Sequence, residues 1–309
     1  MDVADLVAAA RRGEARAVAR LISLVEDESP HLREVGAALA PHVGHAHVVG
    51  LTGPPGVGKS TSTSVLVGAL RRDGQKVGVL AVDPTSPFSG GALLGDRVRM
   101  QEHATDEGVF IRSMASRGHL GGLAGAAPMA LRVLDAAGCD VILVETVGVG
   151  QSEVEIAGLA DTTIVLLAPG MGDGIQALKA GILEIGDVFV VNKADRDGAS
   201  TTRRELRGVV AARQSEWKAP IVLTVATTGE GVDDVVAAVH QHREHLEGGE
   251  LERRRLARAR REIEALALGS LRRRMDDLTG DARLGSLAAD VVAGRTDPLT
   301  AADTILERL

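Results

Sequence analysis

The chain has 309 residues, a formal net charge of −7, 45% apolar residues and only 1% aromatic residues. That length and apolar content suit one large α/β domain with extensions, or two small domains, while the mild acidity and the scarcity of aromatic rings argue against nucleic-acid binding. The single cysteine, Cys139, excludes an intramolecular disulfide, and without an apolar run of about 18 residues the sequence predicts a cytoplasmic protein with no membrane association.

Residues 1–45 predict an N-terminal helical extension, which Pro30 divides into two short helices. Its apolar face consists of Leu6, Val18, Leu21, Ile22 and Val25.

His42, His45 and His47 lie close enough to one another in the sequence to suggest a metal site. Because no cysteine or carboxylate completes a ligand set, a linker entering the first strand is the favoured interpretation.

Residues 46–247 predict a single α/β domain, because short Val/Ile/Leu runs alternate there with helical stretches. The runs are "HVVGLTG", "KVGVLAVD", "VFIRSM", "DVILVET", "TTIVLLAP", "DVFVVNKAD" and "APIVLTVAT". The helical stretches are 59–72, about 91–103, 122–137, 172–185, 199–214 and 231–247. Continuously apolar strands separated by helices indicate a doubly wound, mostly parallel sheet with both faces covered. Cys139 precedes one of these strands and is interpreted as a small buried residue.

The stretch "GPPGVGKST" at residues 53–61 fits G-x-x-x-x-G-K-[ST], and it follows a predicted strand and opens a predicted helix. The glycines allow the backbone N–H groups to wrap a phosphate, and the helix N-terminus favours the same anion. Lys59 is expected to bridge the β- and γ-phosphates and Ser60 to bind Mg²⁺. The expected nucleotide-binding residues are Gly53, Pro54, Pro55, Gly56, Val57, Gly58, Lys59, Ser60 and Thr61.

The stretch "VVNKAD" at 190–195 carries N-K-x-D after a late strand and resembles the guanine signature of P-loop GTPases. The Asp195 carboxylate can accept hydrogen bonds from N1–H and the exocyclic amine of guanine, whereas against adenine it would stay unpaired. Asn192 can contact the purine edge and the Lys193 stem can cover the ring. The pattern favours GTP over ATP.

The loop "TVATTGEG" lies one βα unit later, where this class places a Ser-Ala pair against guanine O6. Val225 replaces that serine, so the backbone N–H of Ala226 is the expected donor, with Thr227 beside it.

Three further segments resemble the MeaB/ArgK family: "AVDPTSPFSGGALLGDRVRM" at 81–100, "FIRSMASRGHLGGLA" at 110–124 and "ILVETVGVGQSEVEI" at 142–156. These are SIMIBI-class GTPases that act as chaperones of adenosylcobalamin-dependent acyl-CoA mutases, chiefly methylmalonyl-CoA mutase. The resemblance covers nearly the whole chain. It implies Mg²⁺-dependent hydrolysis of GTP to GDP. It also implies a mutase partner, whose cofactor loading this chain gates and which this chain protects from inactivation.

The resemblance places Asp83 and Asp96 in the first switch region and Glu145 where many GTPases carry a Walker-B aspartate. All three follow or end predicted strands, where ligands of a doubly wound sheet bind. We expect them, together with Ser60, around Mg²⁺ or its water shell. Lys59, Asp83, Asp96 and Glu145 are the expected catalytic residues.

Small GTPases place a catalytic glutamine where this chain has Val149, and Gln151 comes two positions later. We therefore expect slow intrinsic hydrolysis, with Gln151 either orienting the water or packing the switch. The resemblance makes the glycine-rich segment 169–181 a third switch, with Asp173 and Lys179 as polar contacts to the mutase.

Residues 248–309 predict a helical arm without strands. Leu256, Ala259, Ile263 and Leu266 form a stripe for packing on another helix. The arm is therefore expected to dock on the domain or on a second subunit, and a homodimer is the favoured interpretation. Acidic residues dilute the many arginines of the arm, which favours a solvated helix face over an RNA or membrane contact.

Two other functions belong to related classes. A metallochaperone GTPase of the urease or hydrogenase maturation type would usually display Cys/His ligands or a His-rich tail, which this chain lacks. A kinase or ATPase linked to basic amino-acid transport would require a preference for ATP.

Overall fold

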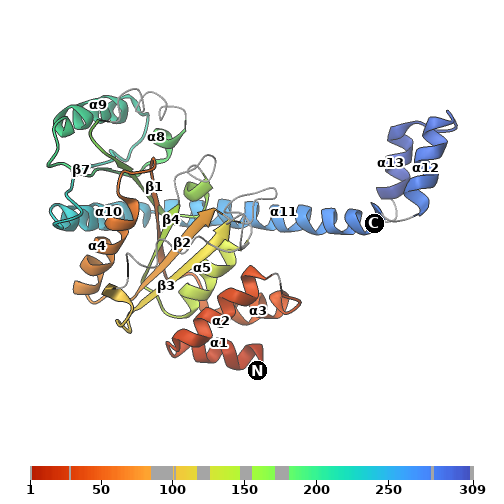
Figure 1. Ribbon diagram of the computed structural model, residues 1–309, viewed down its shortest axis with the longest axis horizontal. Helices are drawn as coiled ribbons and strands as arrows, with labels where there is room; N and C mark the ends of the chain where they lie inside the picture. Colours follow the sequence, from red (N-terminus) through yellow and green to blue (C-terminus); the bar gives the residue numbers. More distant parts are fainter. Residues whose placement is uncertain are drawn as a thin grey trace. The chain divides into compact units, whose positions relative to one another are not determined.

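Seven parallel strands form one sheet in the order β3-β2-β4-β1-β5-β6-β7 (Figure 1). The structure is a computed structural model that describes residues 2–27, 29–84, 100, 102–116, 126–146, 155–170, 181–279 and 282–306. The strands are β1 (His47–Thr52), β2 (Val77–Pro84), β3 (Val109–Ser116), β4 (Val141–Thr146), β5 (Thr162–Leu167), β6 (Val188–Val191) and β7 (Ile221–Leu223). Each run predicted as a strand is present, and the predicted doubly wound parallel sheet is confirmed.

Helices cover both faces of this sheet because successive strand residues point to opposite sides. Val48 of β1 packs in one apolar cluster with α5 (Ala127–Ala136), whereas Val49 packs in another with α4 (Lys59–Arg72) and α10 (Val232–Leu246). A third cluster joins β5 and β6 to α9 (Ala199–Ala212). The described residues also form the short elements η1 (Ala40–His42), η4 (Ile156–Gly158) and α8 (Ile182–Ile185).

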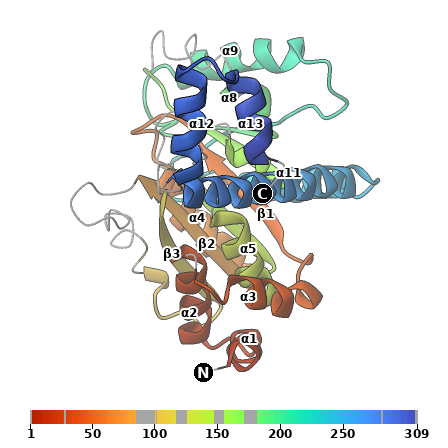
Figure 2. The same cartoon turned by 90° about the vertical axis from the view of Figure 1, so that its right-hand side faces the viewer.

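Three helices, rather than the predicted two, precede η1: α1 (Val3–Arg11), α2 (Ala15–Glu26) and α3 (Leu32–Leu39). The prediction missed the break at Gly13, whose φ of 86° is left-handed and ends α1 in the way that glycines commonly end helices. The predicted apolar residues are all buried. The three helices lie beside α5 and share its cluster (Figure 2), so they form part of the same core as the sheet.

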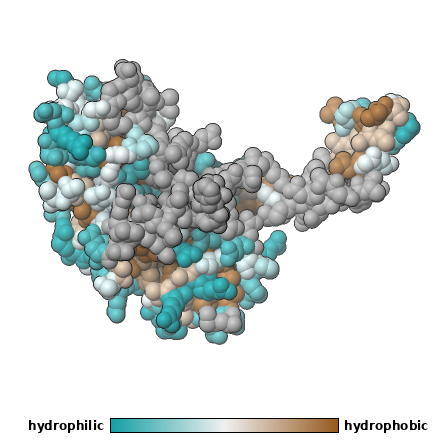
Figure 3. All heavy atoms as spheres, viewed as in Figure 1, coloured by the Kyte–Doolittle hydropathy of each residue, from teal (hydrophilic) through white to brown (hydrophobic). Residues whose placement is uncertain are grey.

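The chain forms two compact units, Met1–Arg255 and Leu256–Leu309. The second consists of most of α11 (Glu250–Thr279), then α12 (Ala282–Val292) and α13 (Pro298–Leu306). Leu256, Ile263 and Leu266 of the predicted stripe are 53%, 67% and 53% exposed. Figure 3 shows further apolar surface, in brown, on the α12–α13 pair. Within the described parts of both units, no helix has the length and apolarity to cross a bilayer.

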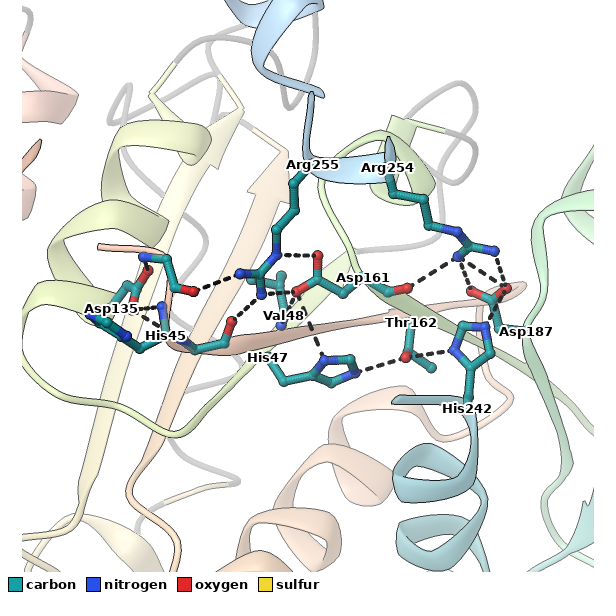
Figure 4. A network of polar contacts seen from close by, with 12 residues as sticks. His45, His47, Val48, Asp135, Asp161, Thr162, Asp187, His242, Arg254 and Arg255 are labelled. Atoms are coloured by element: carbon teal, nitrogen blue, oxygen red, sulfur yellow. Dashed lines mark hydrogen bonds and ion pairs between the residues drawn. The ribbon is translucent and has the colours of Figure 1, made fainter. Parts of the chain in front are cut away.

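A buried polar network lies at the amino-terminal edge of the sheet (Figure 4). Asp161, just before β5, accepts from the Val48 N–H at 3.0 Å and from Nη2 of Arg255 at 3.0 Å. Asp187, just before β6, accepts from the Thr163 N–H at 2.8 Å and pairs with Arg254 at 3.3 Å. These two arginines were expected on a solvated helix face. They are instead two-thirds buried, because the carboxylates draw the first turn of α11 onto the strand ends.

Two histidines complete the network through one hydroxyl group. The Thr162 Oγ1 lies 2.8 Å from Nε2 of His47 and 2.8 Å from Nδ1 of His242. His47 is buried, and within the described residues no cluster of histidine, cysteine and carboxylate side chains could hold a metal ion.

Cys139 is buried as well, and burial raises the pKa of its thiol to about 12, so it is no nucleophile at neutral pH.

Candidate functional site

The carboxyl-terminal ends of the strands bring the predicted nucleotide residues to one edge of the sheet. The loop 53–58 joins β1 to α4, Glu145 is the penultimate residue of β4, and Asn192 directly follows β6. Residues 224–226 follow β7. Since all strand pairs are parallel, these segments converge although they are far apart in sequence.

Glycines shape the loop 53–58 because neighbouring groups leave no room for side chains. At Gly53, φ is 143° and an added Cβ would lie 2.2 Å from the carbonyl oxygen of Leu166. At Gly58, φ is 96° and a Cβ would lie 2.5 Å from Nδ2 of Asn192. Both backbone conformations and both contacts require glycine, and the loop opens directly into the first turn of α4.

Lys59 folds back over this loop from the start of α4. Its Nζ donates to the carbonyl oxygens of Gly53 at 2.7 Å and Pro54 at 3.1 Å, and the residue is buried. Of the loop itself, Val57 is buried while Pro55 and Gly56 are exposed. The ammonium group therefore lies over the loop backbone, next to the amino end of the helix, where its positive charge and the helix dipole favour the same anion.

A buried carboxylate joins the first turn of α4 to β4. Oε1 of Glu145 accepts from Oγ of Ser60 at 2.6 Å, and Oε2 lies 2.9 Å from Oγ1 of Thr63. All three side chains are buried. Hydroxyl and carboxylate oxygens are the hard ligands that Mg²⁺ prefers, so this donor set fits such an ion. Thr63 was not predicted as a site residue, although it lies three residues after Ser60 and hence on the same helix face.

Asn192 ties three segments of the edge together. Its Nδ2 donates to the carbonyl oxygen of Val57 at 2.8 Å, and its Oδ1 accepts from the Ala226 N–H at 3.0 Å and from Oγ1 of Thr224 at 3.2 Å. The Ala226 N–H, predicted to face guanine O6, is thus already bonded within the protein. Asn192 is itself buried, so its amide fixes the loop and the β7 end relative to each other.

Lys193 and Asp195 are the other two residues that the N-K-x-D pattern assigns to the nucleotide. Lys193 has a left-handed φ of 58°, rare for a residue with a side chain, and its Nζ donates to the carbonyl oxygen of Gly56 at 2.7 Å. Its stem therefore spans from the N-K-x-D segment to the loop. Asp195 is exposed to solvent on the same side. Val225 is buried and pairs with Glu230 in an isolated bridge, while Thr227 is exposed.

Some predicted residues cannot be placed in this arrangement. Asp96, Gln151, Asp173 and Lys179 lie outside the described residues. The backbone of Asp83 lies next to the end of β2, paired with Ala115 of β3, and so belongs to the same carboxyl edge.

Comparisons with known proteins agree on one family. A family model described as methylmalonyl Co-A mutase-associated GTPase MeaB matches residues 18–279. A Pyrococcus horikoshii protein named as a candidate GTPase is 47% identical over 311 residues, covering 99% of this chain and 98% of the relative.

More distant relatives carry more specific names. The GTPase ArgK of Escherichia coli is 37% identical and matches 77% of this chain and 75% of its own length. The mouse methylmalonic aciduria type A homolog, a mitochondrial protein, is 36% identical over 79% of this chain and 64% of its own. A solved structure described as a LAO/AO transport system kinase superimposes with a TM-score of 0.71 at 27% identity, covering 99% of this chain and 96% of that one.

Proposed function

The chain belongs to the MeaB family of GTPases, and we propose that it uses Mg²⁺-dependent GTP hydrolysis to act as a chaperone of an adenosylcobalamin-dependent acyl-CoA mutase, chiefly methylmalonyl-CoA mutase. The observation that carries the proposal is the match of residues 18–279 to a family described by its association with that mutase. The mouse relative's name, which refers to methylmalonic aciduria, supports the same partner.

In this proposal the loop 53–58 wraps the phosphates with its N–H groups. Lys59 exchanges its two carbonyl partners for the β- and γ-phosphates, a stronger pairing because the new acceptors are charged. Ser60 and Glu145 hold Mg²⁺ directly or through its water shell, with Asp83 and Asp96 contributing from the first switch. The ion neutralises the charge that develops on the phosphates.

Guanine is recognised by Asp195, whose exposed carboxylate is available to the N1–H and amine of the base. The Lys193 stem, held across the site by Gly56, covers one ring face. Asn192 acts through its bonds to Val57 and Ala226, which hold the loop 53–58 and residues 224–226 in fixed positions relative to each other. Asn192 is therefore a positioning residue in this proposal.

Hydrolysis acts on the partner through the switches. Loss of the γ-phosphate releases loops that the phosphate and Mg²⁺ hold. We assign Gln151 to the second switch and Asp173 and Lys179 to the third, which contacts the mutase. The exposed stripe of Leu256, Ile263 and Leu266 supports a homodimer, because such a stripe is normally covered by another helix.

Nucleotide preference tests the GTPase site against the kinase function that the similar solved structure carries in its description. Calorimetric titration with Mg²⁺ should show tight binding of GTP and weak binding of ATP. Asp195→Asn should shift the preference from guanine toward xanthine nucleotides, whose exocyclic oxygen can accept from the new amide. Tighter binding of ATP by the unmodified chain would reject the proposal.

Association with the mutase tests the chaperone part separately. Immobilised methylmalonyl-CoA mutase should retain the chain in a nucleotide-dependent manner and raise its rate of GTP hydrolysis. Absence of binding with GDP, with a non-hydrolysable GTP analogue and without nucleotide would remove the chaperone function and leave the GTPase intact.

A further inference from the structure

A polar pocket lies at the amino-terminal edge of the sheet, at the opposite strand ends from the loop 53–58. Its volume is about 510 Å³. The polar side chains that line it come from the end of α1, the segment between α3 and β1, the segment from α5 to β4, and the last turn of α10. They are Arg11, His42, His45, Asp135, Asp140 and Arg243.

The carboxylates of this pocket are held by backbone N–H groups. Asp135 accepts from the N–H groups of residues 44, 45 and 46 at 2.5, 3.2 and 3.0 Å (Figure 4). Asp140 accepts from the N–H of Lys76 at 2.7 Å. These bonds fix both side chains as parts of the wall.

The basic side chains of the pocket, in contrast, have no partners. Within the described part of the chain, no hydrogen bond or ion pair joins the side chain of Arg11, Arg243, His42 or His45 to another residue. The ammonium group of Lys76 adds a further positive charge behind the wall, where it donates to the Ala137 carbonyl oxygen at 3.1 Å. Two permanent cations, Arg11 and Arg243, therefore line the pocket with unused donors, whereas its two carboxylates already accept hydrogen bonds.

The wall that carries the histidines is fixed from two sides. Asp135 binds the N–H groups of residues 44–46, and Arg255 donates to the carbonyl oxygens of Gly44 at 2.6 Å and Ala46 at 2.8 Å (Figure 4). A segment held on both its donors and its acceptors has little freedom to collapse into the pocket. The site is thus preorganised, which lowers the entropic cost of binding a ligand.

We propose that this pocket binds a small organic anion through Arg11 and Arg243, with His42 and His45 as additional donors. Guanidinium groups match carboxylate and phosphate oxygens in pairs of parallel hydrogen bonds. The volume lies within the range of sites for metabolite-sized ligands, roughly 300–1,000 Å³. The ligand is therefore an organic phosphate or a polycarboxylate, bound independently of the nucleotide.

The experiment uses the full chain saturated with Mg²⁺ and a non-hydrolysable GTP analogue, so that the loop 53–58 is occupied. Calorimetry at constant ionic strength then titrates two probes, glycerol 3-phosphate for the phosphate class and succinate for the carboxylate class. Saturable binding of either probe is expected, and the stronger one identifies the class. Absence of saturable binding of both probes would overturn the proposal.

Matched variants localise the site. Arg11→Gln and Arg243→Gln should each weaken probe binding by about tenfold or more, the loss expected for one charge-assisted contact. Arg12→Gln is the control, because it removes the same charge from the neighbouring residue, whose partner is Glu14 outside the pocket. The folded state of each variant is checked by its thermal unfolding midpoint. Equal weakening by Arg12→Gln would show non-specific attraction and overturn the proposal.

Discussion

The two edges of the one sheet use polar residues in opposite ways. At the amino edge, Asp161 and Asp187 are buried and bonded to arginines, N–H groups and a histidine network that belong to the fold. At the carboxyl edge, Lys59 donates to the carbonyl oxygens of Gly53 and Pro54, which a phosphate can replace. A buried polar group is therefore structural where its partners are fixed, and functional where a stronger ligand can displace them.

The largest expected effect is at the carboxyl edge, on activity. Lys59→Ala should lower GTP hydrolysis by about 10³-fold, the size of effect typical for one charged group that stabilises the transferred phosphoryl group. The free energy of unfolding in urea should fall by about 1–3 kcal/mol, because the hydrogen bonds to the carbonyl oxygens of Gly53 and Pro54 are lost. Turnover measured with saturating Mg²⁺ checks the prediction.

Lys218→Ala provides the matched control for this change. Lys218 is exposed and lies outside the site, so its loss removes the same charge without touching the loop. Turnover of Lys59→Ala equal to that of Lys218→Ala would contradict the assignment of Lys59 to the phosphates.

The next effect is at the amino edge, on stability. Asp161→Ala should lower the free energy of unfolding by about 3–5 kcal/mol, because it leaves Arg255 and the Val48 N–H without their buried acceptor. The rate of GTP hydrolysis per folded molecule should stay unchanged. Asp233→Ala is the control: its pair with Arg72 is exposed and should contribute about 1 kcal/mol or less. Similar urea midpoints for the two variants would mean that the network does not stabilise the fold.

A pH dependence should follow from the same network. Burial lowers the pKa of His47 from 6.5 to about 4, opposed by Asp161 and reinforced by Arg243. Because the folded pKa lies below the unfolded value, the unfolded chain takes up a proton first as the pH falls. Stability should therefore be fully present above pH 6.5 and decrease toward pH 4, by a total on the order of 3 kcal/mol.

Urea unfolding between pH 7 and 5 isolates this effect. Burial raises the pKa of Asp187, but its hydrogen bond and charge interaction with His242, together with Arg254, outweigh burial and lower it below the ordinary value of 3.8. The stability that Asp187 contributes is therefore lost only at more acidic pH. His47→Gln should flatten the pH dependence, whereas His31→Gln, at an exposed position, should not. An unchanged slope in His47→Gln would refute the assignment.

The carboxyl edge could be predicted from sequence and the amino edge could not. The glycine loop, Lys59 and Ser60 are contiguous, so the spacing alone indicates a phosphate site. In contrast, His47, Asp161, Thr162 and His242 are each ordinary polar residues, and only the parallel strand order brings them together. Gly13 was missed because a single glycine within a helical pattern is compatible with either a continuous or a broken helix. Asp161 and Asp187 each stand immediately before a strand, and this is the one signal that could have indicated carboxylates at the strand ends.

The smallest expected effect concerns Glu145, where the two behaviours meet. Glu145 is buried like Asp161, yet its carboxylate oxygens accept from the hydroxyl groups of Ser60 and Thr63. A carboxylate can exchange a hydrogen bond from a hydroxyl group for a bond to a metal ion at little cost. Glu145 therefore resembles Lys59, whose partners a ligand can displace. Glu145→Gln keeps the shape and loses the charge, so it should weaken Mg²⁺-dependent hydrolysis by about 10–100-fold while stability changes little. Turnover as a function of Mg²⁺ concentration checks this, with Glu155→Gln as a carboxylate control beyond the end of β4. A large loss of stability at unchanged Mg²⁺ dependence would instead make Glu145 a structural residue. Glu145 would then act like Asp161, although it lies at the carboxyl edge of the sheet.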